Sequence, residues 1–223
     1  MQVGRFVCVA LILLFLVIGL CQPVLADNAT KLLFKVQERY EQIETLKVGF
    51  KQTLINAQSG QKEHREGKIY FMRPRFIRWQ TKSPQEELII VNKEEVWNYI
   101  PKEKIAYKYS FSQMFESKNF ISFLTGETNI NQDFIIKEKE KGEKGWVKFV
   151  LKPKKPEMSL VLAKIWVDPE SSLLQRLYFE DYFNNGNQIT FTQVQLNDEL
   201  NASQFKFAPP KEIKIIDNTP SAK

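Results

Sequence analysis

The stretch from Gly67 to Pro101, GKIYFMRPRFIRWQTKSPQEELIIVNKEEVWNYIP, decides the fold of this chain. Turn-forming residues interrupt it at Arg73-Pro74, at Ser83-Pro84 and at residues 92–95. Between these turns the segments have the length and the alternation of short strands. Because the connections are too short for parallel crossovers, the stretch predicts consecutive antiparallel strands.

Alternation along these strands predicts which side chains share a face. In the first strand an apolar row ends at Arg73, and the turn at Pro74 follows directly. We expect the bulky side chains to form one apolar, concave surface. They are Ile69, Phe71, Ile77, Trp79, Trp97 and Tyr99.

Four motifs in this order resemble one protein family. They are GKIYFMRPRFIRW at 67–79, LIIVN at 88–92, VWNYIP at 96–101 and FKFAPP at 205–210. Together they resemble the periplasmic outer-membrane lipoprotein carriers of the LolA type, over about Asp27 to Ile216. Two positions depart from the family pattern: Ile77 stands where an aromatic residue is common, and Tyr70 where a tryptophan can occur.

The resemblance implies a function and a site. It implies a periplasmic chaperone that takes acylated lipoproteins from an inner-membrane ABC-type releasing complex and passes them to an outer-membrane receptor. It implies no catalysis and no cofactor. A family arginine matching Arg73 is thought to latch a helical lid by hydrogen bonds to backbone carbonyls of the lid. The expected lining of the hydrophobic cavity adds Phe115, Ile121, Leu124 and Phe149 to the six residues named above.

The first residues predict export. A basic start with Arg5, an apolar run from Phe6 to Leu20 and the residues Val24-Leu25-Ala26 are typical of a signal peptide cleaved after Ala26. The expected mature chain, 27–223, is long enough for one domain. It would act in the periplasm as a monomer. Residues 217–223 are expected to form a disordered tail.

Cysteine and charge limit the chemistry of the mature chain. Both cysteines, Cys8 and Cys21, precede Ala26, which excludes disulfides and thiolate catalysis after cleavage. Cleavage lowers the net charge from +6 to +5, because Arg5 is the only charged residue it removes. This balance fits attraction to anionic lipid headgroups, or simply a lysine-rich soluble surface.

The remaining segments predict strands and two or three helices. A helix is expected from Asp27 or Asn28 to about Leu46, and a second at Ser110–Thr125, ended by Gly126. Hairpins are expected at 134–152 and 173–196, with a bulge near Thr192. FKFAPP and residues 212–216 are expected to be edge strands. The fold class is therefore α+β: a curved antiparallel sheet forming an incomplete β-barrel, whose helices cover the concave face and enclose a hydrophobic cavity.

Catalytic, metal-binding and nucleic-acid chemistry find little support. His64, the single histidine, lies in a charged segment, no serine has a nucleophile-elbow setting, and Glu86-Glu87 has no partners at ligand spacing. The basic and aromatic residues Arg75, Arg78 and Trp79 fit a strand better than base stacking. Each of these residues also has an ordinary structural interpretation, as core, strand end or surface.

Three alternatives remain open. An outer-membrane receptor of the same fold would need a lipid on Cys21, although Leu20 is unsuited to the position before a lipidated cysteine. A regulatory domain that senses lipoproteins would normally be joined to a second domain. An enzyme would be revealed by an effect of His64→Ala.

Overall fold

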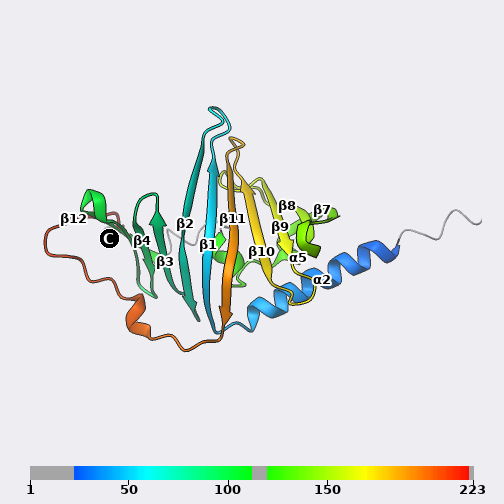
Figure 1. Cartoon of the computed structure of the whole chain (residues 1–223), viewed down its shortest axis with the longest axis horizontal. Helices are drawn as coiled ribbons and strands as arrows, with labels where there is room; N and C mark the ends of the chain where they lie inside the picture. Colours follow the sequence, from blue (N-terminus) through cyan, green and yellow to red (C-terminus); the bar gives the residue numbers. More distant parts are fainter. Residues whose placement is uncertain (1–22, 112–119, 221–223) are drawn as a thin grey trace, which may run out of the picture.

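The computed structural model describes residues 23–111 and 120–220, which form one large sheet with helices on one side (Figure 1). The helices are α2 (Pro23–Glu41), α4 (Phe120–Leu124) and α5 (Ile130–Asp133), with 3-10 turns η1 (Pro101–Glu103), η2 (Glu143–Gly145) and η3 (Ala202–Phe205). The strands are β1 (Thr45–Ile55), β2 (Lys62–Met72), β3 (Phe76–Ser83), β4 (Glu87–Val91), β5 (Glu95–Ile100), β6 (Ile105–Ser110), β7 (Phe134–Lys141), β8 (Val147–Pro153), β9 (Leu162–Val167), β10 (Leu174–Glu180), β11 (Gly186–Leu196) and β12 (Lys214–Asp217).

The sheet is open. Its twelve strands run in the order β12-β6-β5-β4-β3-β2-β1-β11-β10-β9-β8-β7, so β12 and β7 are edges (Figure 1). All neighbours are antiparallel except β12 and β6, which run parallel. The curved, unclosed antiparallel sheet expected from the sequence is thus confirmed, with β12 as its parallel exception.

The helices cover one face of the sheet, here called the inner face. Leu33, Val36 and Tyr40 of α2 are buried in the same cluster as the inner-face residues of the strands. Phe50 of β1 packs on Trp79 of β3 with ring centroids 5.0 Å apart. Burial of this many large side chains supplies most of the stabilisation of the fold.

Helix α2 differs from its prediction at both ends. It is already helical at Pro23, the first described residue, ahead of the expected Asp27 or Asn28, and it ends at Glu41 rather than near Leu46. Ile43 and Leu46 fit the helical spacing, but Leu46 pairs with Leu196 and Phe71 in the sheet. Strand pairing on both sides therefore overrides helical periodicity here.

The helix predicted over Ser110–Thr125 is confirmed at its carboxyl end, Phe120–Leu124, while residues 112–119 lie outside the described part of the chain. Helix α4 ends at Leu124, and Gly126 follows it with φ +73°, the left-handed conformation typical of a helix end. A Cβ at Gly126 would lie 3.1 Å from the backbone of Tyr40, so α2 approaches this turn closely. The short helix α5 was not predicted.

The carboxyl-terminal segment crosses the other face of the sheet, here called the outer face. FKFAPP is not a strand, which corrects its prediction: Phe205 ends η3 and the next residues have no regular structure. Phe207 instead packs on Trp97 and Tyr99, with ring centroids 5.2 and 5.4 Å apart. The chain then forms β12, which includes Asp217, the first residue of the expected disordered tail.

The bulge predicted near Thr192 is confirmed. The β1–β11 register shifts between the pairs Lys47–Gln195 and Gly49–Thr192, and Gln193 has φ +52°. The extra residue accounts for the change of phase between Phe191 and Val194. In the described segments, no helix combines the length and the apolar character needed to span a membrane.

Candidate functional site

Helices α2, α4 and α5 together form the cover of the inner face, and Arg73 holds one end of it. The guanidinium donates from Nε to the carbonyl of Ile43 and from one Nη to the carbonyls of Tyr40 and Glu41, each at 2.7 Å. These carbonyls lie at or just beyond the end of α2, where helical backbone acceptors have no intrahelical partner. The cation also complements the negative end of the helix dipole.

The Arg73 side chain is fixed by its hydrogen bonds although it is only partly buried. Its side chain is 29% exposed, its Nε lies 3.9 Å from the carboxylate of Glu44, and its Cζ lies 6.0 Å from the ring centroid of Phe71. Charge-assisted hydrogen bonds contribute about 1.5–3 kcal/mol each when shielded from water. Partial exposure lowers that contribution, so the contact can break and re-form.

The cover has two halves, α2 and the α4–α5 segment. Arg75, on the other side of Pro74, contacts the α4–α5 half. Its Nε donates to the carboxylate of Glu127, between α4 and α5, at 2.8 Å. Its Cζ also lies 5.2 Å from the ring centroid of Phe111. The β2–β3 turn therefore touches both halves of the cover.

Gln37 joins the two halves of the cover directly. Its Nε2 donates to the carbonyl of Gly126 at 3.1 Å, and its Oε1 accepts from the backbone N–H of Ile130 at 3.3 Å. The side chain is only 8% exposed, so these bonds replace those it would make to water. Gln37 is a polar clasp between α2 and the turn that leads to α5.

Buried hydroxyl groups continue this polar path inside α4 and its turn. Thr128 donates from Oγ1 to Oγ of Ser122 at 2.7 Å, and its backbone N–H donates to the Ser122 carbonyl at 3.0 Å. Thr125 is also buried. The cover therefore rests on an apolar sheet but is internally connected by hydrogen bonds.

Tyr40 ties α2 to β10. Its hydroxyl accepts from the backbone N–H of Leu174 at 3.1 Å. Burial raises the pKa of this phenol well above its usual value, more than the hydrogen bond from Leu174 and the charge of Arg39 lower it. The phenol is therefore neutral and fixed at ordinary pH.

Seven of the expected cavity residues lie together in the inner-face core. They are Ile69, Phe71, Ile77, Trp79, Ile121, Leu124 and Phe149. Each is buried against its neighbours. Whether they contact an acyl chain stays a prediction.

Trp97 and Tyr99 are a correction. They share a face as predicted, but it is the outer face, because Val91 pairs with Val96 and so places Val96 rather than Trp97 on the inner side. They pack beneath Phe207 and cannot line an inner cavity. Phe115 lies outside the described residues.

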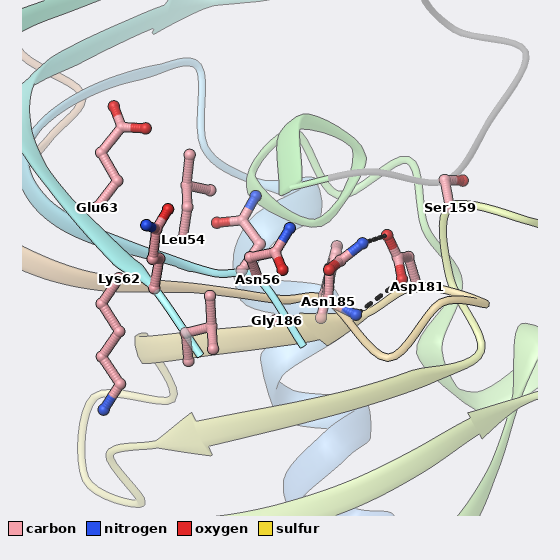
Figure 2. Close-up of a pocket in the computed structure, with 12 residues that line it drawn as sticks. Leu54, Asn56, Lys62, Glu63, Ser159, Asp181, Asn185 and Gly186 are labelled. Carbon is pink, nitrogen blue, oxygen red and sulfur yellow. Dashed lines mark hydrogen bonds between the residues drawn. The ribbon is translucent and has the colours of Figure 1, made fainter. Parts of the chain in front are cut away.

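A pocket of about 720 Å³ opens at the end of the sheet opposite Arg73, and we call it the port. Figure 2 shows Lys62 and Glu63 on one side of it and Asp181, Asn185 and Ser159 on the other. It is lined by residues 54–56 and 61–63 of the β1–β2 hairpin, by Ser159, Phe179 and Asp181, and by residues 185–187. Its walls are therefore partly apolar and partly made of amides.

Sequence reasoning missed the clasp and the port. One signal for Gln37 was available: it is a polar residue inside the apolar stripe formed by Leu33, Val36 and Tyr40. The port depends on how two hairpins distant in sequence lie side by side. No local pattern carries that information.

The described residues show little that could support catalysis. In the two described ranges no three His, Cys, Asp or Glu side chains gather as metal ligands would. His64 lies on the exposed side of β2, with Nδ1 3.1 Å from the hydroxyl of Thr53.

Sequence comparison relates this chain to known proteins. The profile of the family "Outer membrane lipoprotein carrier protein LolA" matches residues 41–208. An outer-membrane lipoprotein carrier protein of Azotobacter vinelandii is 26% identical over 194 residues, covering 87% of this chain and 91% of the relative. One from Pseudomonas aeruginosa strain UCBPP-PA14 is 28% identical over 175 residues, covering 78% and 81%.

A solved structure supports the fold alone. An uncharacterized conserved protein from Thermus thermophilus superposes with a TM-score of 0.54 at 12% identity, covering 85% of this chain and 99% of that one.

Proposed function

Since this chain belongs to the family of outer membrane lipoprotein carrier proteins, LolA, we propose that it is a periplasmic chaperone for lipoproteins. It binds the acyl chains of lipoproteins released from the inner membrane by an ABC-type complex and delivers them to an outer-membrane receptor. The curated relatives are named as carriers, and none of the steps proposed here requires catalysis or a cofactor.

The observation that carries the proposal is the inner face with its cover. A wide apolar sheet surface is shielded by helices that polar contacts through Arg73 and Gln37 hold in place. Transfer of an acyl chain from water is favourable by about 0.8 kcal/mol per methylene. An apolar surface of this kind can receive such chains once the cover moves.

Reversible transport needs a contact within the protein that competes with the bound acyl chains for the inner face. In the closed protein, inner-face residues pack against the cover, so loading must separate contacts such as Phe123 with Phe179, whose ring centroids are 5.1 Å apart. Loading must also move the α2 carbonyls away from Arg73. The recovered packing and hydrogen bonds then favour release, and this is the role we propose for Arg73 as a latch.

The test is native mass spectrometry of the protein isolated from an exporting cell, with and without lipoprotein synthesis. We expect a chain that begins at Asp27 and carries acylated cargo at a stoichiometry of about one to one. A lipid on Cys21 would instead support a membrane-fixed receptor. A mature chain that never carries acylated cargo would contradict both assignments.

A further inference from the structure

The inner face changes from apolar to polar along β1, towards the port. Val48 and Phe50 are buried in the core, but Gln52, two residues further, is a buried amide. Its Nε2 donates to Oδ1 of Asn187 on β11 at 2.9 Å. Asn187 also lines the port, so this amide pair marks the boundary between oily core and open pocket.

Phe179 connects the port with the cover. The ring lines the port, is 5% exposed and packs on Phe123 of α4. An acyl chain that displaced Phe123 from the inner face would therefore reach the port directly past Phe179. The port therefore lies directly beside the part of the inner face that α4 covers.

Hydrogen bonds fix the walls of the port. Asp181 accepts from the backbone N–H groups of Phe183 and Asn185, both at 2.8 Å, and from the side chain of Asn185 at 2.9 Å (Figure 2). Asn185 in turn accepts from the backbone N–H of Ala57 at 3.0 Å, which joins the two hairpins. These ties hold the pocket in shape before any ligand arrives.

Three exposed apolar side chains follow or precede port residues Ser159 and Asp181 in the sequence, and we call them the rim: Met158, Tyr182 and Phe183. They are 60%, 64% and 64% exposed. The backbone N–H of Tyr182 donates to the carbonyl of Met158 at 3.0 Å, so the two loops that carry them are joined. Large, exposed apolar side chains that lie together next to a pocket are typical of a binding surface.

We propose that the port and its rim bind the polar junction of an acylated lipoprotein, where the acylated glyceryl-cysteine meets the polypeptide. This inference rests on the proposed function. The polarity of the ligand changes along its length in the same order as the polarity of the surface. Its acyl chains lie under the cover, and its ester and amide groups lie at the amides of the port. The first peptide residues lie against the rim. Side-chain amides both donate and accept, as such a junction requires.

The experiment compares two ligands on the full mature protein. One is a synthetic dipalmitoylated glyceryl-cysteine peptide, and the other is free palmitate, which has chains but no junction. Ser159→Trp fills the port from an exposed position, and Ser203→Trp, exposed on η3 across the sheet, is the matched control. We expect Ser159→Trp to weaken lipopeptide binding about tenfold and palmitate binding less than twofold.

The outcomes separate the inference from the proposed function. If Ser159→Trp leaves both ligands unaffected, or weakens both equally, the port does not bind the junction. If the wild-type protein binds neither ligand, the proposed function itself fails and the inference falls with it. Unchanged binding by Ser203→Trp shows that the loss comes from the port.

A second variant keeps the test independent of how the tryptophan packs. Phe183→Ser removes one rim side chain, and Phe34→Ser removes a 52% exposed phenylalanine from α2. We expect only Phe183→Ser to weaken lipopeptide binding, by about threefold to tenfold, with palmitate unchanged. Equal effects of the two changes would overturn the role of the rim.

Discussion

At the scale of single residues, a few hydrogen bonds distinguish the cover from an ordinary core helix layer. Arg73 donates to three carbonyls at one end of α2, and Tyr40 accepts from Leu174 nearby. The first joins the end of α2 to the β2–β3 turn and the second joins α2 to β10, so neither joins two strands. They therefore act on the position of the cover and leave the sheet ladder intact.

Replacing Arg73 with leucine should tighten binding of acyl chains and slow their transfer. The change removes hydrogen bonds that exist only while the cover is closed, so the open state becomes more populated. We expect about fivefold to tenfold stronger binding of a fluorescent fatty acid and a slower release to acceptor protein. Arg78→Leu is the control, because Arg78 also donates to a backbone carbonyl, that of Gln204 at 3.1 Å, but lies on the outer face. Equal binding and transfer by Arg73→Leu and wild type would exclude a latch.

The phenol of Tyr40 should make stability depend on pH in the alkaline range. Its folded pKa lies above the ordinary value of 10.0, chiefly through burial. The unfolded chain therefore loses this proton first, and the free energy of unfolding falls as pH rises above about 10. Urea denaturation at pH 9 and pH 11 should show a smaller fall for Tyr40→Phe than for wild type. The variant should also be about 1–3 kcal/mol less stable at pH 9, because the buried N–H of Leu174 loses its acceptor. Identical pH slopes would contradict this role.

Residue patterns predicted side-chain burial better than side-chain partners. Alternation placed Ile69, Phe71 and Trp79 correctly on one face, because strand geometry fixes period two. The partners of Gln37 lie about ninety residues away in sequence and in a turn, so they follow from tertiary packing alone. For Arg73, backbone carbonyls as partners were implied by the family resemblance, and the structure places it beside carbonyls at the end of α2.

At the scale of elements, the sheet has two apolar faces at its β3–β6 end. The inner cluster continues beneath the cover, while Trp97, Ile90 and Ala106 form a smaller cluster on the outer face. Alternation separates Trp97 from Val96 but does not say which of the two faces the helices. The register across the β4–β5 turn decides it, and that is why the expected cavity role of Trp97 and Tyr99 was wrong.

The carboxyl-terminal segment should act as a structural strap over the outer face. Phe207→Ala removes a ring that packs on both Trp97 and Tyr99, so we expect a loss of about 1–3 kcal/mol in the free energy of unfolding. The emission of Trp97 should shift to longer wavelength as water reaches it. Phe183→Ala, which alters an exposed ring, should change stability by less than about 0.5 kcal/mol. An unchanged unfolding curve for Phe207→Ala would contradict the strap.

The clasp between α2 and the α4–α5 turn should contribute measurably to stability. Gln37→Leu leaves the carbonyl of Gly126 and the N–H of Ile130 without this partner, which costs about 1–3 kcal/mol. Chemical denaturation measures the change, and Gln42→Leu, at an exposed position just after α2, is the control. A loss no larger than that of the control would show that the two halves of the cover are not coupled through Gln37.

At the scale of the whole molecule, a continuous hydrogen-bonded sheet carries a cover attached by a small number of side chains. Ligand entry should therefore loosen the cover and leave the sheet unchanged. Hydrogen exchange measured with and without a lipopeptide should show faster exchange at 121–133 and near the end of α2 in the loaded protein. The strands β1, β10 and β11 should keep their protection. Uniform protection in both states would contradict a moving cover.

The pairing of β1 with β11 has a consequence for how the chain reaches its folded state. This ladder lies in the middle of the sheet and joins residues 45–55 to residues 186–196. Strand β1, the first to be synthesised, can therefore pair with β11 only after nearly the whole chain has been made. High contact order of this kind slows folding. A chain delivered amino-terminus first through a secretion channel would accordingly remain unfolded until nearly all of it had emerged. With no cysteine beyond Cys21, it could then fold without an oxidase or an isomerase for disulfides.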